Sequence, residues 1–314
     1  MSHFRKDPLT RRWVVVAPRR QQRPRRPNQC PFCPGNEDMT PPEISRSGSN
    51  SSWQVRVIPN LFPILGDDKK PELAGNYKYR KGNGFHEIII ETPVHDHHIA
   101  DLSIDEMVLV LKTYNERIEA HREEKGLKYS LIFKNFGRRA GASLKHSHSQ
   151  IISMPLIPKR ILEEIATAKR YYRKTGQCFF CQMIREELDY HKRVIVNNAK
   201  FLAFVPFAAR IPYETWIIPK DHYTNICGID QTHQIELAKT LKSSLVKLNR
   251  VLDTPPFNYF IHTAPIGDDQ IPYYHYHLVI MPATTRLGGF ELGTGFYVNQ
   301  SLAEEDAQRL KEAG

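Results

Sequence analysis

Residues 130–153 read SLIFKNFGRRAGASLKHSHSQIIS, and residues 258–281 read NYFIHTAPIGDDQIPYYHYHLVIM. Each stretch contains an apolar strand-like run, a glycine-containing loop and a second strand-like run that begins around a His-x-His pair. The pairs are His146 with His148 and His275 with His277. One pattern that occurs twice in a chain, in the same order, indicates an internal duplication.

The sequence before each His-x-His pair repeats as well. His95 and His222 each follow an apolar run and a proline, and they precede His146 and His275 by 51 and 53 positions. Residues 103–124 and 230–253 carry apolar side chains at the three-to-four spacing of an amphipathic helix. Ser103 and Asp230 are suited to cap these two helices at their N-termini.

The repeat predicts an α+β fold of two related modules, each an antiparallel sheet with one long helix. We expect the modules over residues 1–158 and 159–314, with a helical linker at 159–175. Parallel βαβ winding is less expected, because the strands follow one another in short hairpin-like pieces. The Pro-rich residues 24–42 and the Ser-rich residues 45–52 are expected to be loops.

Composition narrows the class of protein. The 314 residues are 40% hydrophobic with a mean hydropathy of -0.48, which is typical of a globular protein and excludes collagen-like, coiled-coil and disordered chains. The apolar runs are strand-sized and no signal-peptide core is present, so we expect a cytoplasmic protein without a membrane span. A net charge of +10 favours anionic partners such as nucleic acid, nucleotides or phosphorylated metabolites.

Four of the five cysteines form Cys-x-x-Cys pairs, which in a reducing compartment indicate metal or redox chemistry. Zinc prefers four tetrahedral nitrogen or sulfur ligands, and such a closed shell is structural rather than catalytic. Each half of the chain offers one set of four such ligands. In the first set, His97 and His98 compete with His95 for one ligand position. The fifth cysteine, Cys227, is expected to be a core residue. The two predicted zinc sites are Cys30, Cys33, His95 and His146, and Cys178, Cys181, His222 and His275.

His146, His148 and Gln150 occupy alternate positions, so on a strand they share one face. A neutral His148 beside a phosphoanhydride is suited to attack phosphorus, and Gln150 can hydrogen-bond the phosphoryl oxygen. The preceding Gly-Ala-Ser loop offers backbone N–H groups to phosphate. The second copy lacks this loop and lacks a glutamine two residues after His277, so only the first copy is expected to be catalytic.

Five segments together resemble the galactose-1-phosphate uridylyltransferase family of the histidine-triad superfamily. They are RWVVVAPRRQQRPRRP, CPFCPGNE, VRVIPNLFP, KNFGRRAGASLKHSHSQ and FELGTGFYVN. The resemblance implies two histidine-triad-like half-barrel modules, the N-terminal one catalytic, in a homodimer. It also implies transfer of UMP from UDP-glucose to galactose 1-phosphate through a covalent nucleotidyl intermediate on His148.

The same resemblance assigns binding residues. Nucleotide-site positions of the family match Arg20, Arg23, Asn60, Asn135, Gly141 and Ser143. Phe290 and Glu291 match the hexose site, in a segment that the partner subunit contributes. Some members build the second metal site from one Glu and three His, which match Glu164, His262, His275 and His277; we favour Cys178 and Cys181 because thiolates are stronger zinc ligands.

Three alternatives to uridylyl transfer remain at this stage, and two of them are enzymes: a nucleotide-sugar phosphorylase and a dinucleotide hydrolase. Ser147 stands where uridylyltransferases usually carry proline, whereas the related ADP-glucose phosphorylases, which transfer AMP to phosphate, carry serine. From a different class, a zinc-dependent nucleic-acid-binding protein would use the basic residues 19–26 to neutralise phosphates. That interpretation leaves His148, Gln150 and the glycine loop unexplained.

Overall fold

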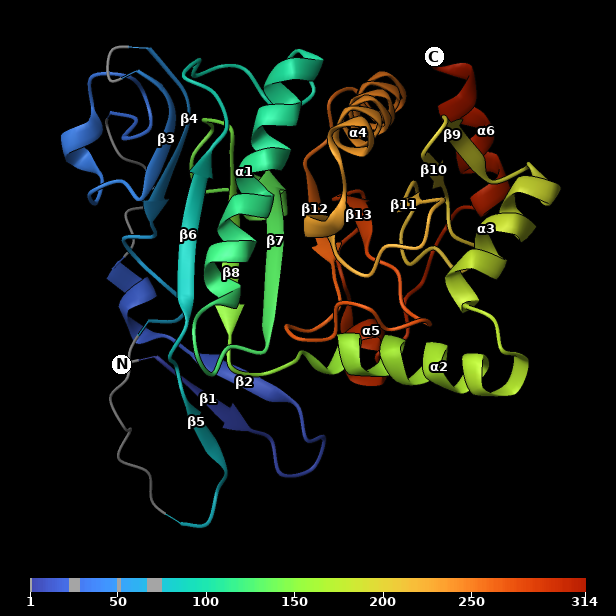
Figure 1. Cartoon of the computed structure of the whole chain (residues 1–314), viewed down its shortest axis with the longest axis horizontal. Helices are drawn as coiled ribbons and strands as arrows, with labels where there is room; N and C mark the ends of the chain where they lie inside the picture. The colour runs from blue at the N-terminus through green and yellow to red at the C-terminus, as the bar shows by residue number, and fades with distance from the viewer. Residues whose placement is uncertain (1, 23–28, 50–51, 67–74) are drawn as a thin grey trace.

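The computed structural model describes residues 2–22, 29–49, 52–66 and 75–314 (Figure 1). Its centre is one sheet of ten strands in the order β3-β4-β6-β8-β7-β12-β13-β11-β10-β9, and every described pairing is antiparallel. The strands of the first half are β3 (Ser45–Ser49), β4 (Ser52–Pro59), β6 (Phe85–Ile90), β7 (Tyr129–Phe136) and β8 (His148–Met154). Those of the second half are β9 (Val194–Asn197), β10 (Phe201–Phe204), β11 (Thr215–Pro219), β12 (Phe257–His262) and β13 (His277–Pro282).

The sheet consists of the same five-stranded unit twice. Strands β3, β4, β6, β8 and β7 of the first half correspond in order to β9, β10, β11, β13 and β12 of the second. The halves join where β7 pairs with β12, with Asn135 opposite Asn258. The sequence therefore predicted the α+β class and the antiparallel pairing correctly, and the structure adds that the two units share one continuous sheet.

Helices α1 (Ile104–Arg122) and α4 (Gln231–Leu252) are the long helices of the two halves and lie over the same face of the sheet (Figure 1). The Ser103 side chain caps α1 in a capping box with Glu106, and the Asp230 side chain accepts a hydrogen bond from the His233 N–H. The predicted caps are thus confirmed. Met107, Leu111, Leu241 and Leu245 are among the buried side chains that bind the helices to the sheet.

The remaining elements surround this core. A small sheet pairs β1 (His3–Lys6) with β2 (Trp13–Val16) and β5 (Tyr79–Lys81). The other helices are α2 (Lys159–Thr175), α3 (Phe179–Tyr190), α5 (Gly289–Thr294) and α6 (Ala303–Glu312), with short 3-10 turns at Pro18–Gln22, Glu37–Met39, Arg138–Ala140 and Ile226–Gly228. Within the described residues, no helix has both the length and the apolar character needed to cross a membrane.

One expected loop is a strand. Residues 45–49, which are rich in serine, form β3 at the edge of the sheet and pair with β4. Their composition gave no strand signal, because an edge strand with mostly polar side chains needs no apolar face. Gly48, at φ +94, lies at the irregularity where the register shifts.

Candidate active site and metal centres

Strand β8 begins at His148, and His148 and Gln150 project from the face opposite α1 and α4. Ile151, one residue out of phase, lies in the core beneath those helices. His146 lies just before the strand, fully buried. The alternation predicted from the sequence therefore holds for His148 and Gln150, which line a cavity, whereas His146 precedes the strand and is directed to the cysteines.

The hydrogen bond of His148 defines which ring nitrogen can react. Its Nδ1 atom lies 2.8 Å from the backbone oxygen of His146. A carbonyl can only accept, so Nδ1 carries the proton and Nε2 of the neutral ring carries the lone pair. Among the described residues, His148 belongs to none of the groups that could hold a metal ion. This arrangement is suited to nucleophilic chemistry at Nε2.

A residue that the sequence did not single out orients Gln150. Nδ1 of His86 accepts a hydrogen bond from the Ile64 N–H at 3.0 Å, so the proton of the neutral ring is on Nε2. That Nε2–H donates to Oε1 of Gln150 at 2.9 Å. Because the amide oxygen is bound to His86, the amide N–H2 is the end of Gln150 that can meet a phosphoryl oxygen. The alternation in β6, which pairs with β8, was the signal that could have found His86.

The cavity at His148 has a volume of about 200 Å³. Apolar side chains form most of its wall, among them Phe32, Ile58, Leu61 and Ile88. Its polar residues are Thr40, Asn60, Ser143, His148 and Gln150, of which Asn60 and Ser143 are predicted nucleotide-site residues. Oδ1 of Asn60 accepts a hydrogen bond from the Phe62 N–H, which fixes its amide. An apolar slot with a few convergent polar groups is typical of a small-ligand site.

A second cavity, of about 700 Å³, lies on the same face of the sheet. Phe133, which pairs with Gln150 across the β7–β8 ladder, is part of its wall, as are Asn135, Arg139 and Arg160. Oδ1 of Asn135 accepts a hydrogen bond from Asn258 of the second half. Two arginines give this cavity a basic rim, which favours anionic groups.

The loop between β7 and β8 depends on glycine at two points. Gly137 has φ +77, and a Cβ there would lie 2.8 Å from Cβ of Pro256. Gly141, a predicted nucleotide-site residue, has φ +89 at the end of the 3-10 turn. Only glycine adopts both conformations without strain. The loop therefore takes a defined path toward Ser143 and the first cavity.

Three predicted binding residues that the structure describes, Arg20, Phe290 and Glu291, are not among the residues that line the cavity at His148. Arg20 lies in the 3-10 turn at Pro18–Gln22 and donates to the Phe62 oxygen at 3.0 Å; burial lowers its pKa. Arg23 lies outside the described residues. Phe290 and Glu291 are on α5, outside the two cavities, and Phe290 is 56% exposed.

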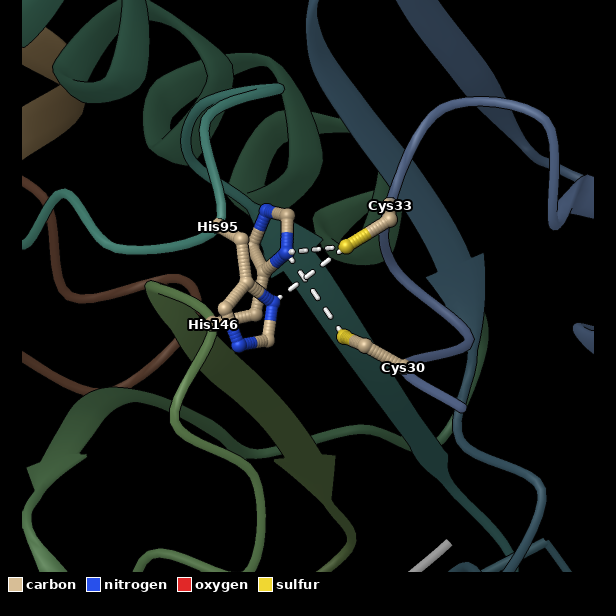
Figure 2. Close-up of side chains that lie close together, drawn as sticks. All are labelled: Cys30, Cys33, His95 and His146. Atoms are coloured by element: carbon tan, nitrogen blue, oxygen red, sulfur yellow. Dashed lines mark hydrogen bonds between the residues drawn. The ribbon is translucent and has the colours of Figure 1, made fainter. Parts of the chain in front are cut away.

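The first predicted metal set is assembled as a compact group (Figure 2). Potential ligand atoms of Cys30, Cys33, His95 and His146 all lie within 4.8 Å of one another. Sγ of Cys33 is 3.2 Å from Nδ1 of His95, and Nε2–H of His146 donates to the Thr92 oxygen at 2.7 Å. The lone pair of His146 is therefore on Nδ1, which faces the cysteines, and burial lowers its pKa, as a neutral metal ligand requires.

His97 and His98 take no part in this group. The Ala100 N–H donates to Nδ1 of His98, and the His98 ring tilts against Phe136. Phe32, between the two cysteines, connects the group to His148. Its ring contacts His148 edge-on at a centroid distance of 5.3 Å and forms part of the cavity wall.

The second predicted set is also assembled. The ligand atoms of Cys178, Cys181, His222 and His275 lie within 4.8 Å of one another. Sγ of Cys181 is 3.3 Å from Nε2 of His275, and a hydrogen bond from Cys181 holds the pKa of the Cys178 thiol below its usual range. Phe180, between these cysteines, stacks on His275 as a counterpart of Phe32.

The alternative ligand set of the second half is divided. His275 is with the cysteines, while Glu164, His262 and His277 form a separate group. Burial raises the pKa of Glu164, but its hydrogen bond with His262 and the charges of His262, His277 and Arg160 together outweigh burial and lower it to about 2. Burial lowers the pKa of His277 to about 3. The second half of this chain therefore contains two groups of possible metal ligands, the Cys2His2 group and the group of Glu164, His262 and His277.

Family models match both halves of the chain. The model described as galactose-1-phosphate uridyl transferase, N-terminal domain, matches residues 1–158, and the model of the C-terminal domain matches residues 164–313.

Individual relatives cover nearly the whole chain. ADP-glucose phosphorylase from Arabidopsis thaliana is 36% identical over 98% of this chain and 92% of its own, and a crystal structure of that enzyme with bound ADP-glucose matches with a TM-score of 0.82 over 99% of both chains. A solved uridylyltransferase is 31% identical, with a TM-score of 0.87 over 100% of this chain and 98% of the other. Galactose-1-phosphate uridylyltransferase from Thermotoga maritima is 28% identical over 99% of this chain and 98% of its own.

Proposed function

The chain belongs to the galactose-1-phosphate uridyl transferase family, and we propose that it moves UMP from UDP-glucose to galactose 1-phosphate through a covalent intermediate on His148. The observation that carries this proposal is the bond from Nδ1 of His148 to the His146 oxygen, which leaves the lone pair on Nε2 at a cavity of nucleotide-binding character.

In the first half-reaction, Nε2 of His148 attacks the α-phosphorus of UDP-glucose. A nitrogen–phosphorus bond forms, the bond from that phosphorus to the bridging oxygen breaks, and glucose 1-phosphate leaves with the bond electrons. The ring becomes cationic and keeps its Nδ1 proton on the His146 carbonyl, so no proton transfer is needed. The amide of Gln150, oriented by His86, donates to the phosphoryl oxygen as charge develops there.

In the second half-reaction, a phosphate oxygen of galactose 1-phosphate attacks the same phosphorus and the nitrogen–phosphorus bond breaks, which restores neutral His148. The base occupies the apolar cavity beside Phe32 and Leu61. The sugar phosphate lies toward the second cavity, where Arg139 and Arg160 attract its charge. Phe290 and Glu291 reach the hexose from the partner subunit, in keeping with their place on the exposed α5.

Zinc is the metal we propose for both Cys2His2 groups, because two thiolates and two imidazoles form its preferred tetrahedral shell. When bound, zinc supplies a structural link and no open coordination position. The residues of the first group hold the Cys30–Cys33 turn, and with it Phe32, against His148. Those of the second group hold the start of α3 against the segment just before β13, which carries His275.

A second candidate activity is ADP-glucose phosphorolysis, in which AMP is bound to His148 and inorganic phosphate removes it. The observation that favours it is the 36% identity to the Arabidopsis thaliana enzyme, together with Ser147 between the two histidines. The chemistry at His148 is the same in both activities, and only the base and the acceptor differ.

One experiment tests both candidates. The intact protein is incubated with UDP-glucose or ADP-glucose and weighed by mass spectrometry, and the adduct is then exposed to galactose 1-phosphate or phosphate. A UMP adduct that galactose 1-phosphate removes supports the uridylyltransferase. An AMP adduct that only phosphate removes supports the phosphorylase, and the absence of any adduct overturns the covalent mechanism.

The proposal includes the organisation of the protein. Residues 1–158 form the catalytic module, and residues 159–314 form the second module, beginning with a linker at 159–175. Two chains associate as a homodimer in the cytoplasm, and each supplies α5 to the other. Sedimentation of the purified protein, with and without removal of residues 289–298, tests the dimer.

A further inference from the structure

A buried ion pair lies behind the strand that carries the nucleophile. Lys134 on β7 and Glu91, directly after β6, flank β8 from its two sides, and each is 1% exposed. Nζ of Lys134 is 2.5 Å from Oε2 of Glu91, 3.0 Å from Oγ of Ser147 and 3.1 Å from the backbone oxygen of His148. The ammonium group therefore binds the main chain of the proposed nucleophile itself.

The hydroxyl groups around Glu91 complete this arrangement. Ser147 donates to Oε2 of Glu91 at 2.6 Å, and Tyr114 of α1 donates to Oε1 at 3.1 Å. Tyr114 also bonds Ser149 at 2.7 Å and Tyr259 of the second half at 2.6 Å. The peptide units on both sides of His148 are thus attached to neighbouring strands and to a helix by side-chain bonds.

The second half of the chain provides an internal comparison. The strand pairings of the two halves can be matched residue by residue. In the first half, Ser149 pairs with Ile89 and Gln150 pairs with Phe133. In the second half, Leu278 pairs with Ile217 and Val279 pairs with Phe260. These pairings show which position of the second half corresponds to each of four polar residues of the first half, and none of the four counterparts is charged. Glu91 corresponds to Pro219, Lys134 to Ile261, Ser147 to Tyr276 and Ser149 to Leu278.

The fold therefore does not require charge at these positions. Ile261, Tyr276 and Leu278 belong to the hydrophobic core of the second half. A buried ion pair costs desolvation free energy that an apolar pair does not, and it contributes little net stability. Its presence only in the half that carries His148 indicates a role in the reaction rather than in folding.

Resting on the proposed function, we propose that Glu91, Lys134 and Ser147 are positioning residues for His148. They act through its backbone from the opposite face of the sheet and make no contact with substrate. By fixing the peptide units at positions 147 and 148, they hold the ring at the distance and angle that attack on phosphorus needs. A displacement of about 1 Å at such a group is enough to lower a rate about a hundredfold.

The test uses the full chain and measures the single-turnover rate and KM of His148 nucleotidylation. The main variant is Lys134→Met combined with Glu91→Gln, which leaves no buried charge unpaired and keeps an acceptor for the tyrosines. We expect its melting temperature to stay close to that of the wild type, its rate to fall about tenfold to a hundredfold and its KM to change less than about twofold.

If the double variant does not fold, two single substitutions of Ser147 test the positioning role. Ser147→Ala removes one hydrogen bond to Glu91 and is expected to lower the nucleotidylation rate about threefold to tenfold. Ser147→Thr keeps the hydroxyl and is expected to react at the wild-type rate. The matched control is Ser130→Ala: Ser130 is a buried serine of β7 whose hydroxyl bonds Ser153, and its loss leaves the rate unchanged.

The outcomes separate the two proposals. If the wild type forms no adduct with any nucleotide sugar, the proposed function fails. If the wild type forms the adduct and Ser147→Ala reacts at the wild-type rate, the positioning role is overturned while the function stands. A fall in rate that matches the fall in stability, in Ser130→Ala as well as in Ser147→Ala, also overturns it.

Discussion

Nδ1 of His148 lies 2.8 Å from the backbone oxygen of His146, the residue whose own ring faces the two cysteines of the first metal group. One residue therefore belongs to the proposed metal site through its side chain and fixes the tautomer of the proposed nucleophile through its carbonyl. The His-x-His spacing makes this possible, because the backbone oxygen of His146 lies within reach of the ring two residues later.

Replacement of His148 by glycine is expected to abolish nucleotidylation, with a fall in rate of about a thousandfold or more, because it removes the attacking nitrogen. Metal content is expected to stay the same, since His148 belongs to neither cysteine group. Mass spectrometry of the adduct and elemental analysis of the same sample check both statements. An adduct of wild-type yield would show that the nucleophile is elsewhere.

Replacement of His86 by alanine is expected to lower kcat about tenfold, because Gln150 loses the donor that orients its amide; this corresponds to about 1–2 kcal/mol of transition-state stabilisation. The control is a double-mutant cycle with Gln150→Leu. If His86 acts through Gln150, its loss costs little once Gln150 is gone. Fully additive effects would assign His86 a separate role.

Replacement of Cys30 by serine is expected to remove one metal ion per chain, lower the melting temperature and lower the nucleotidylation rate about tenfold or more. The rate falls because Phe32, in the same turn, is no longer held against His148. Cys178→Ser is the comparison, since it removes the metal of the other half and is expected to lower the rate less. Equal losses of rate in the two variants would mean that the first group has no specific link to His148.

Acidification is expected to weaken the fold through Glu87. Burial raises the pKa of this carboxyl, but hydrogen bonds from His121 and Arg117, at 2.8 Å each, together with the charges of these partners outweigh burial and lower it below 4.5. A lowered folded pKa means that the stabilisation is complete above the pKa of the unfolded chain and is lost as the pH falls through the folded value.

Urea unfolding midpoints measured from pH 7 down to pH 3 check this expectation. Glu87→Gln should lower the midpoint at pH 7 and reduce its dependence on pH below about 4.5. Glu163→Gln, at an exposed position of α2, is the matched control and should follow the wild-type curve. A Glu87→Gln curve parallel to that of the wild type would exclude this carboxyl as a source of acid sensitivity.

Much of the site was open to prediction because its signals are local in sequence. The two Cys-x-x-Cys pairs and the order of histidines identified the donor groups, and the structure assembles both of them. Helix periodicity with the caps Ser103 and Asp230 located α1 and α4. Among the described residues, polarity was mistaken for a loop at the edge strand β3 and at Ser52, the first residue of β4.

The sequence by itself determined the duplicated α+β design, grouped the cysteines and histidines of two candidate metal sites and predicted His148 rather than His277 as the nucleophile. These follow from spacing and alternation within single segments. Only the tertiary structure decided that the halves share one sheet, that His86 orients Gln150 and that Glu91 and Lys134 meet behind His148. Such contacts depend on the register between strands that are distant along the chain, and register arises from packing that no single segment records.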